Sequence, residues 1–119
     1  MSTTEELDNA KIAIALRSAR TGIGWNQQEF ADLIGVAKST IARIETMEMA
    51  AKGDFLVKAI GLFRTMGLQL ELFTPGKIEI TIEESAIRKA LDMLKDEGRR
   101  RTDRRMKSGI GSLLPDADA

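Results

Sequence analysis

The spacing of hydrophobic positions changes near residue 67, and this change separates two groups of predicted elements. Before it, apolar residues recur three and four positions apart, which places them on one face of a helix. Helices are predicted over residues 7–21, 27–34, 38–45 and 55–66. The segment 21–24, which contains two glycines, is expected to stop the first helix and Gly67 the fourth, while Asn26 and Asp54 are expected to cap the second and fourth. The first part of the chain is therefore predicted to be helical.

After residue 67 the apolar residues alternate with polar ones, which is typical of β-strands. Strands are predicted over residues 68–73 and 77–82. Between them, Pro75 and Gly76 suit the central positions of a type II turn, where glycine takes the positive φ. The prediction is a β-hairpin. A two-stranded hairpin is marginal alone, so we expect it to pack on the helices or on a second copy.

A fifth helix is predicted after the hairpin. Thr81 and Glu84 have the spacing of a capping box, and the apolar residues from Ala86 to Leu94 fall on one helical face. Gly98 is expected to end this helix. The predicted fold class is mainly α, with a domain at residues 1–67, a hairpin plus helix at 68–98, and a basic, flexible tail at 99–119.

Composition removes several chemistries. The 119 residues include no cysteine and no histidine, which excludes disulfides, zinc sites with those ligands, and cysteine or histidine catalysis. We therefore expect no catalytic residues, no metal and no cofactor. No apolar run is long enough to span a bilayer, and the acidic start lacks the basic residues of a signal peptide. The expected protein is cytoplasmic, with no membrane partner.

Charge is balanced overall, with 18 basic and 18 acidic residues, but it is unevenly distributed. One segment, here called the arginine block, consists of Arg99, Arg100, Arg101, Arg104, Arg105 and Lys107. Such a block contacts a polyanion in many proteins and is merely solvated in others. Both interpretations stay open at this point.

The segment at residues 27–45 is the most informative part of the chain. Two short helices joined by a turn that contains Gly35 describe a helix-turn-helix. Ala31 is small where the helices would cross, and Gly35 allows a left-handed backbone in the turn. The residues expected to point inward are Phe30, Ile34, Val36, Ile41 and Ile44. The residues expected on the outer face of the second helix are Lys38, Ser39, Ala42 and Arg43.

This pattern, with the flanking residues from Leu16 to Gly67, resembles the Cro and repressor family of helix-turn-helix proteins, also called the Xre type. The resemblance implies a Cro/lambda-repressor-like helical domain that binds double-stranded operator DNA as a dimer, with its second motif helix in the major groove. Family members often have an asparagine-glycine pair after the position of Glu45, where this chain has Thr46 and Met47.

The resemblance also implies roles for individual residues. Gln27 matches a position that contacts the DNA backbone. The start of the recognition helix, where base edges are read, corresponds to Ala37, Lys38 and Ser39. Thr40 and Arg43 would reach phosphates or flanking bases. The expected function is a transcriptional regulator, specifically a dimeric repressor or autoregulator.

The hairpin adds a looser resemblance to antitoxins of the HipB type, in which a strand after the fourth helix pairs across the dimer. This resemblance implies an alternative function, an antitoxin that binds its operator and neutralises a toxin through its C-terminal region. An intramolecular hairpin is an equal alternative to strand pairing. Residues 68–98 are predicted to form the dimer, with the fifth helix buttressing the two strands. The predicted dimerisation residues are Leu68, Leu70, Leu72, Ile78, Ile80 and Ile82.

Overall fold

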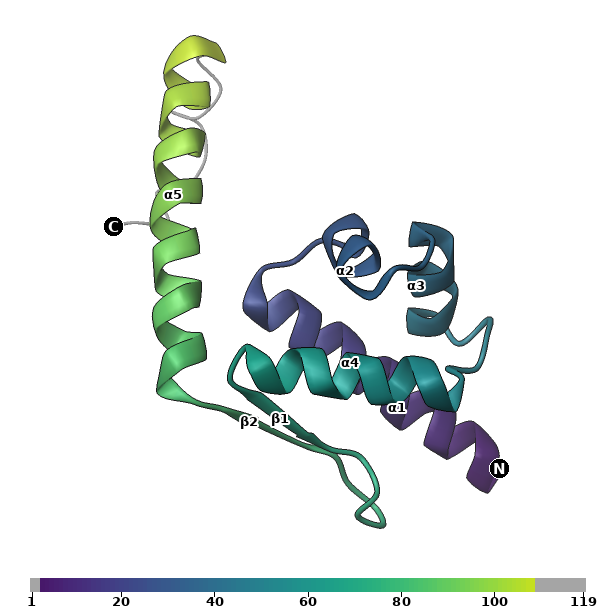
Figure 1. The fold of residues 1–119 in the computed structure, drawn as a ribbon. Coiled ribbons are helices and arrows are strands. Elements are labelled where there is room, and N and C mark those ends of the chain that lie inside the picture. Colours follow the sequence, from purple (N-terminus) through teal and green to yellow (C-terminus); the bar gives the residue numbers. More distant parts are fainter. Residues whose placement is uncertain (1–2, 109–119) are drawn as a thin grey trace.

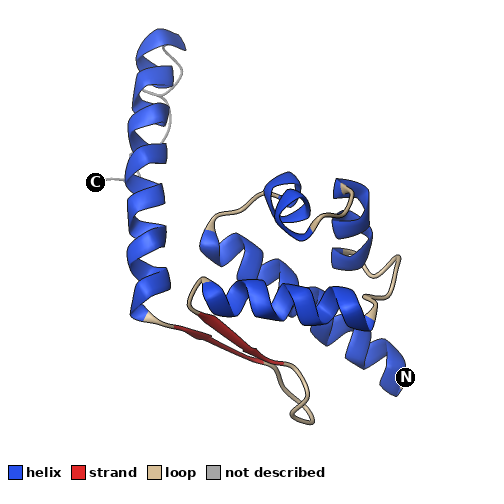
Figure 2. Cartoon of the chain, viewed as in Figure 1, coloured by secondary structure: helices blue, strands red, loops and turns tan. Residues whose placement is uncertain are grey.

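The computed structural model describes residues 3–108. Its elements are, in order, α1 (Thr4–Ile23), α2 (Gln27–Ile34), α3 (Lys38–Glu45), α4 (Gly53–Thr65), β1 (Leu68–Glu71), β2 (Glu79–Ile82) and α5 (Glu84–Ser108). Helices α1 to α4 form a helical body, the hairpin lies beside it, and α5 projects beyond it (Figure 1). The predicted fold class is confirmed: mainly helical, with a two-stranded hairpin and a C-terminal helix (Figure 2).

The core of the helical body is an aromatic cluster surrounded by aliphatic side chains. The Phe30 and Phe63 rings lie 5.2 Å apart between centroids, and the Trp25 ring lies 5.8 Å from Phe63. Phe55 meets the edge of Phe30. Burial of these large side chains removes apolar surface from water, which is the main force that holds the helices together.

Most predicted helix ends in the body are confirmed. Asn26 and Glu29 form a capping box, in which the Glu29 backbone N–H donates to Asn26 Oδ1 at 2.7 Å and the Asn26 N–H donates to Glu29 Oε1 at 3.0 Å. Gly24 and Gly35 end α1 and α2 with φ of 93° and 87°. Glycine occupies these left-handed positions without the steric cost that a Cβ imposes.

Two predicted helix caps are wrong. Lys52 precedes α4 as its N-cap residue. Asp54 lies in the first turn, where its negative charge interacts favourably with the positive end of the helix dipole. Thr81 does not open α5, because it pairs with Gln69 in the hairpin ladder. Helix α5 begins at Glu84 instead.

The far end of α5 also differs from the prediction. The helix does not stop at Gly98 but continues through Ser108, so the backbone of the arginine block is helical. A glycine inside a helix costs only about 1 kcal/mol relative to alanine, which is too little to end a helix by itself. The last part of the predicted tail, residues 109–119, lies outside the described residues.

The hairpin is antiparallel and shorter than predicted, since β1 ends at Glu71 and β2 begins at Glu79. Its register pairs Leu68 with Ile82 and Leu70 with Ile80. Gly76 has a φ of 77°, which confirms the positive φ expected in the turn. The hairpin packs within the chain, because β1 lies against α4 and Leu68 joins the core.

The junction between the hairpin and α5 is tied to the end of α4. The Glu83 backbone N–H donates to the Gly67 carbonyl at 2.8 Å. Gly67 has a φ of 92°, and a Cβ added there would lie 2.6 Å from Ser85 Oγ. Ala86, in the first turn of α5, is 6% exposed and belongs to the core. The start of α5 is therefore anchored to the helical body.

Candidate nucleic-acid interface

Helices α2 and α3 are joined by the three-residue turn from Gly35 to Ala37 and pack tightly together. Ala31 of α2 is 0% exposed, and Ile41 and Ile44 of α3 are 1% and 4% exposed. These buried residues form the inner face of the pair. The structure thus has the two-helix motif that the sequence predicts, with α3 as its second helix.

The outer face of α3 presents polar side chains. Lys38, Ser39 and Arg43 are exposed, and Thr40 is half-buried. Ala37 precedes the helix, and its side chain makes no capping hydrogen bond. The first N–H groups of a helix have no intrahelical acceptor and carry partial positive charge. The beginning of α3 therefore combines a lysine, a hydroxyl and helix N–H donors on one surface.

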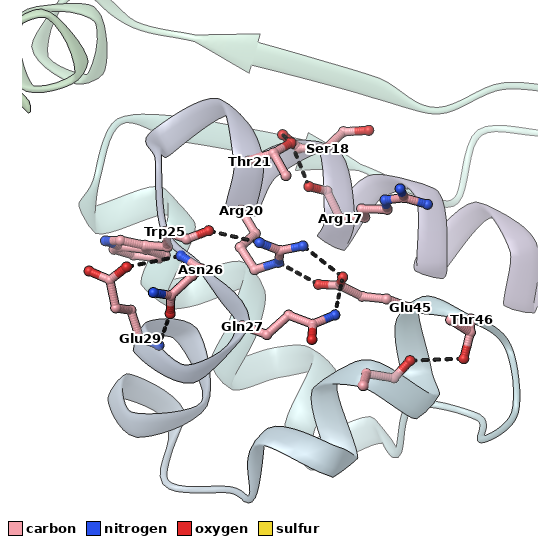
Figure 3. Close-up of polar contacts among 11 residues, drawn as sticks. Arg17, Ser18, Arg20, Thr21, Trp25, Asn26, Gln27, Glu29, Glu45 and Thr46 are labelled. Atoms are coloured by element: carbon pink, nitrogen blue, oxygen red, sulfur yellow. Dashed lines mark hydrogen bonds and ion pairs between the residues drawn. The ribbon is translucent and has the colours of Figure 1, made fainter. Parts of the chain in front are cut away.

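A buried ion pair connects α3 to α1 (Figure 3). Arg20 Nε donates to Glu45 Oε2 at 2.6 Å, and Arg20 Nη2 donates to Glu45 Oε1 at 2.9 Å. The third interaction of the guanidinium is Nη1 to the Trp25 carbonyl at 2.8 Å. Both charged residues are 8% exposed. A bidentate pair of this kind fixes the relative position of the two side chains in distance and in angle.

Gln27 joins the same network, because its Nε2 donates to Glu45 Oε1 at 3.1 Å (Figure 3). Glu45 is the last residue of α3, Arg20 lies in α1, and Gln27 is the first residue of α2. The network therefore fixes the start of α2 and the end of α3 against α1. Within the described part of the chain, every buried side-chain nitrogen and oxygen atom has a hydrogen-bond partner.

Sequence reasoning selected Gln27 but missed Arg20 and Glu45. The structure brings Gln27 to the edge of the motif, half-buried, with its amide nitrogen directed to Glu45. A signal for Arg20 was present in the sequence: it follows Leu16 by four positions and precedes Ile23 by three, so it lies on the buried face of α1. A charge at such a position needs a partner.

The predicted dimerisation residues do not lie on one exposed surface. Leu68 and Leu72 are 2% and 3% exposed, and they are buried inside the protomer. The half-buried members of the set are Leu70, Ile78 and Ile80. Ile82, at the end of β2, is 49% exposed. The hairpin therefore uses most of its apolar face within its own chain.

The described residues hold no cluster of metal-ligating side chains outside the two-helix motif or within it. Across residues 3–96, whose side chains are described, no group of three or more potential metal ligands occurs. A groove of about 900 Å³ separates the first half of α1 from the hairpin loop, with Leu7, Ile14 and Phe73 among its lining residues. Neither α2 nor α3 contributes to it. None of the described helices is long and apolar enough to cross a membrane.

Comparison with known proteins supports the assignment of the two-helix motif. Residues 16–65 match the protein-family model described as helix-turn-helix. The match begins inside α1 and ends with α4, so it lies within the helical body and excludes the hairpin and α5. No curated protein and no solved structure gives a significant match to the chain.

Proposed function

Because residues 16–65 form a helix-turn-helix domain of the Cro/repressor type, the protein is a DNA-binding transcriptional regulator, and we propose that it is a repressor which binds its operator as a homodimer. The observation that carries the proposal is the exposed N-terminal face of α3, held against α1 by the Arg20–Glu45 ion pair. Such a regulator acts where operator DNA is, so we propose a cytoplasmic location.

In the proposed complex, α3 enters the major groove with its N-terminal end toward the bases. Lys38 donates to guanine O6 or N7, and Ser39 bonds to a neighbouring base edge. Ala37 lies at the same end and has space for a close approach to the bases. Thr40 and Arg43, further along the same surface, contact phosphates. These contacts follow from the exposure of the side chains and from the usual placement of a recognition helix.

Gln27 has a related role in the proposed complex. As the first residue of α2, it lies next to helix N–H groups that favour a phosphate. Its amide nitrogen is held by Glu45, so the side chain is oriented before DNA arrives. A preoriented group loses less conformational freedom on binding, and we propose that Gln27 contributes affinity without reading sequence.

A single domain of this size reads only a few base pairs, which is the reason for proposing a dimer. Two copies related by a twofold axis place their recognition helices in successive major grooves, about 34 Å apart. An operator with two half-sites then supplies the specificity that one half-site lacks. Autoregulation of its own promoter would be visible as a footprint on the DNA upstream of the gene.

The decisive experiment compares operator and random DNA. Lys38→Ala is expected to reduce the preference for operator by about 1–3 kcal/mol, while Arg43→Ala weakens binding to both DNAs alike. Lys89→Ala removes the same charge from an exposed position on α5 and serves as the control. If Lys38→Ala weakened both DNAs equally, the assignment of base reading to the start of α3 would be wrong.

A second candidate function is an antitoxin, and the exposed apolar surface of α5 is the feature that favours it. Ile87, Leu91 and Leu94 are 56%, 50% and 59% exposed and follow one another along the helix, and grouped exposed apolar residues mark interaction sites. In this function, the DNA-binding body is unchanged and α5 binds a toxin encoded by a neighbouring gene. A stable complex between the purified chain and that gene product supports the antitoxin. If no such complex forms, the repressor remains the proposed function.

A further inference from the structure

Helix α5 has two apolar faces. The first packs on the chain itself: Ala86 is in the core, and the Met93 Cε lies 3.2 Å from where a Cβ of Gly24 would be. The second face, here called the α5 stripe, consists of Ile87, Leu91 and Leu94, which are 56%, 50% and 59% exposed. Nothing in the described part of the chain covers the α5 stripe.

The spacing of the α5 stripe is that of a helix–helix seam. Its members are four and three residues apart, which is the heptad spacing of residues that meet a partner helix. Full burial of a leucine or isoleucine side chain contributes about 1.5–3 kcal/mol, and half of that surface is still exposed here. The stripe is therefore suited to a second helix with the same apolar spacing.

The charges of α5 indicate the identity and the direction of that helix. Glu83, just before the helix, and Glu84, its first residue, are acidic, and the last part of the helix contains the arginine block. Parallel pairing would bring two arginine blocks together, whereas antiparallel pairing brings each block toward the acidic beginning of the other helix. We propose that the α5 stripe binds the α5 stripe of a second copy in the antiparallel direction.

One local charge pair opposes this arrangement, and it is weak. In antiparallel pairing, Arg88 of one copy approaches Lys95 of the other, because both lie on the same flank of the seam. Arg88 already contacts Glu84 at 3.4 Å, and both side chains are more than 70% exposed. Exposed pairs contribute about 0.2–1 kcal/mol and are screened by salt, so a whole block of six cations outweighs them.

The proposal replaces the hairpin with α5 as the main dimer contact. Leu68 and Leu72 are buried in the protomer and are unavailable to a partner. Ile82, exposed at 49%, adds apolar surface near the start of α5. The resulting interface is small, and interfaces below about 1,200 Å² are typical of weak association. We expect a dimer that forms in the micromolar range and is strengthened by two half-sites on DNA.

The pairing can be tested by cross-linking, because the chain contains no cysteine. Three variants each carry one cysteine: Ile87→Cys, Leu91→Cys and Leu94→Cys. In antiparallel pairing of the whole stripe, Leu91 lies near the twofold axis and Ile87 of one copy meets Leu94 of the other. An oxidised mixture of Ile87→Cys with Leu94→Cys therefore gives more disulfide dimer than either of these two variants alone. If each variant cross-linked best with itself, the helices would be parallel and the proposal would be overturned.

Sedimentation of the full chain supplies the second test. Leu91→Lys places a charge in the seam and is expected to weaken the dimer at least tenfold, while Val57→Lys changes an apolar residue that is 73% exposed on α4 and leaves the dimer unchanged. Circular dichroism confirms that both variants fold. A wild-type monomer throughout the micromolar range, an equal effect of the two substitutions, or binding of the stripe only to another protein overturns the proposal.

This inference deepens the proposed function, since it names the surface that would join two DNA-binding domains. The two can fail separately because neither test above contains DNA. Cross-linking without any operator preference would keep the α5 pairing and reject the repressor. Operator binding by a chain that never cross-links across α5 would keep the repressor and reject the α5 pairing.

Discussion

Replacing Glu45 by alanine is expected to destabilise the helical body strongly. The substitution removes the carboxylate that accepts two hydrogen bonds from Arg20 and one from Gln27. Arg20 then remains 8% exposed, with its positive charge balanced only by the Trp25 carbonyl dipole. A buried charge without a partner keeps most of its desolvation penalty, because no Coulomb attraction to an opposite charge offsets it.

The size of the effect follows from this burial. Removal of one member of a buried ion pair costs about 3–5 kcal/mol, compared with a total stability of about 5–15 kcal/mol for a typical domain. Glu45→Ala should therefore remove a large part of the free energy of unfolding. Replacing both partners with apolar residues, as in Arg20→Met with Glu45→Leu, removes the unpaired charge and should recover most of the loss. Gln27 is half-buried, so water can replace its lost acceptor.

Urea unfolding followed by tryptophan fluorescence measures these changes, because the single tryptophan, Trp25, lies in the core at 9% exposed. Glu84→Ala is the matched control: it breaks an exposed pair with Arg88, in which the side chains are 79% and 74% exposed, and should cost less than about 1 kcal/mol. A loss for Glu45→Ala no larger than that of the control would refute the reasoning.

Four further predictions concern single features. Gly67→Ala should destabilise the protein by about 1–3 kcal/mol, because Gly67 has a φ of 92° and the new Cβ meets Ser85. Gly61→Ala inside α4, where no atom lies within 4 Å of a new Cβ, should stabilise the protein slightly. Urea unfolding compares the stabilities of the two variants. Met47→Gly should stabilise by about 1 kcal/mol, since Met47 has a φ of 65°. Asn26→Ala should lower the free energy of unfolding by about 1 kcal/mol through loss of the capping box. An unchanged urea midpoint for Met47→Gly or for Asn26→Ala would contradict the cause given for that variant. Deletion from Arg99 onward should flatten the plot of log affinity for DNA against log salt, and an unchanged slope would exclude the arginine block from DNA binding.

The helical body could be predicted from the sequence because its signals are local. Asn26 with Glu29 encodes a cap, and Gly35 encodes a stop, whatever the rest of the chain does. The predicted end of α5 at Gly98 was wrong because it also depended on one local signal. A glycine there is a weak local signal, and the strong helix formers on both sides of it outweigh its cost.

Features that depend on distant parts of the chain were harder to predict. Arg20 and Glu45 are 25 positions apart, and charged residues are ordinarily assigned to the surface, so their pairing required the folded structure. The alternation in the hairpin identified its apolar face correctly but did not show what covers that face. Leu68 and Leu72 are covered by the body of the same chain, and this cannot be read from a period of two.

The anchor at Gly67 gives α5 the mechanical character of a lever. From Glu84 to Leu94, the end of the α5 stripe, the helix is about 15 Å long, and a tilt of about 10° at its base moves Leu94 by about 3 Å. This displacement approaches one base-pair step of about 3.4 Å. Small changes in packing around Gly67 and Ala86 would thus be amplified along α5. The spacing between half-sites that a dimer prefers could then evolve at this junction, far from α3, without any change in the bases that α3 reads.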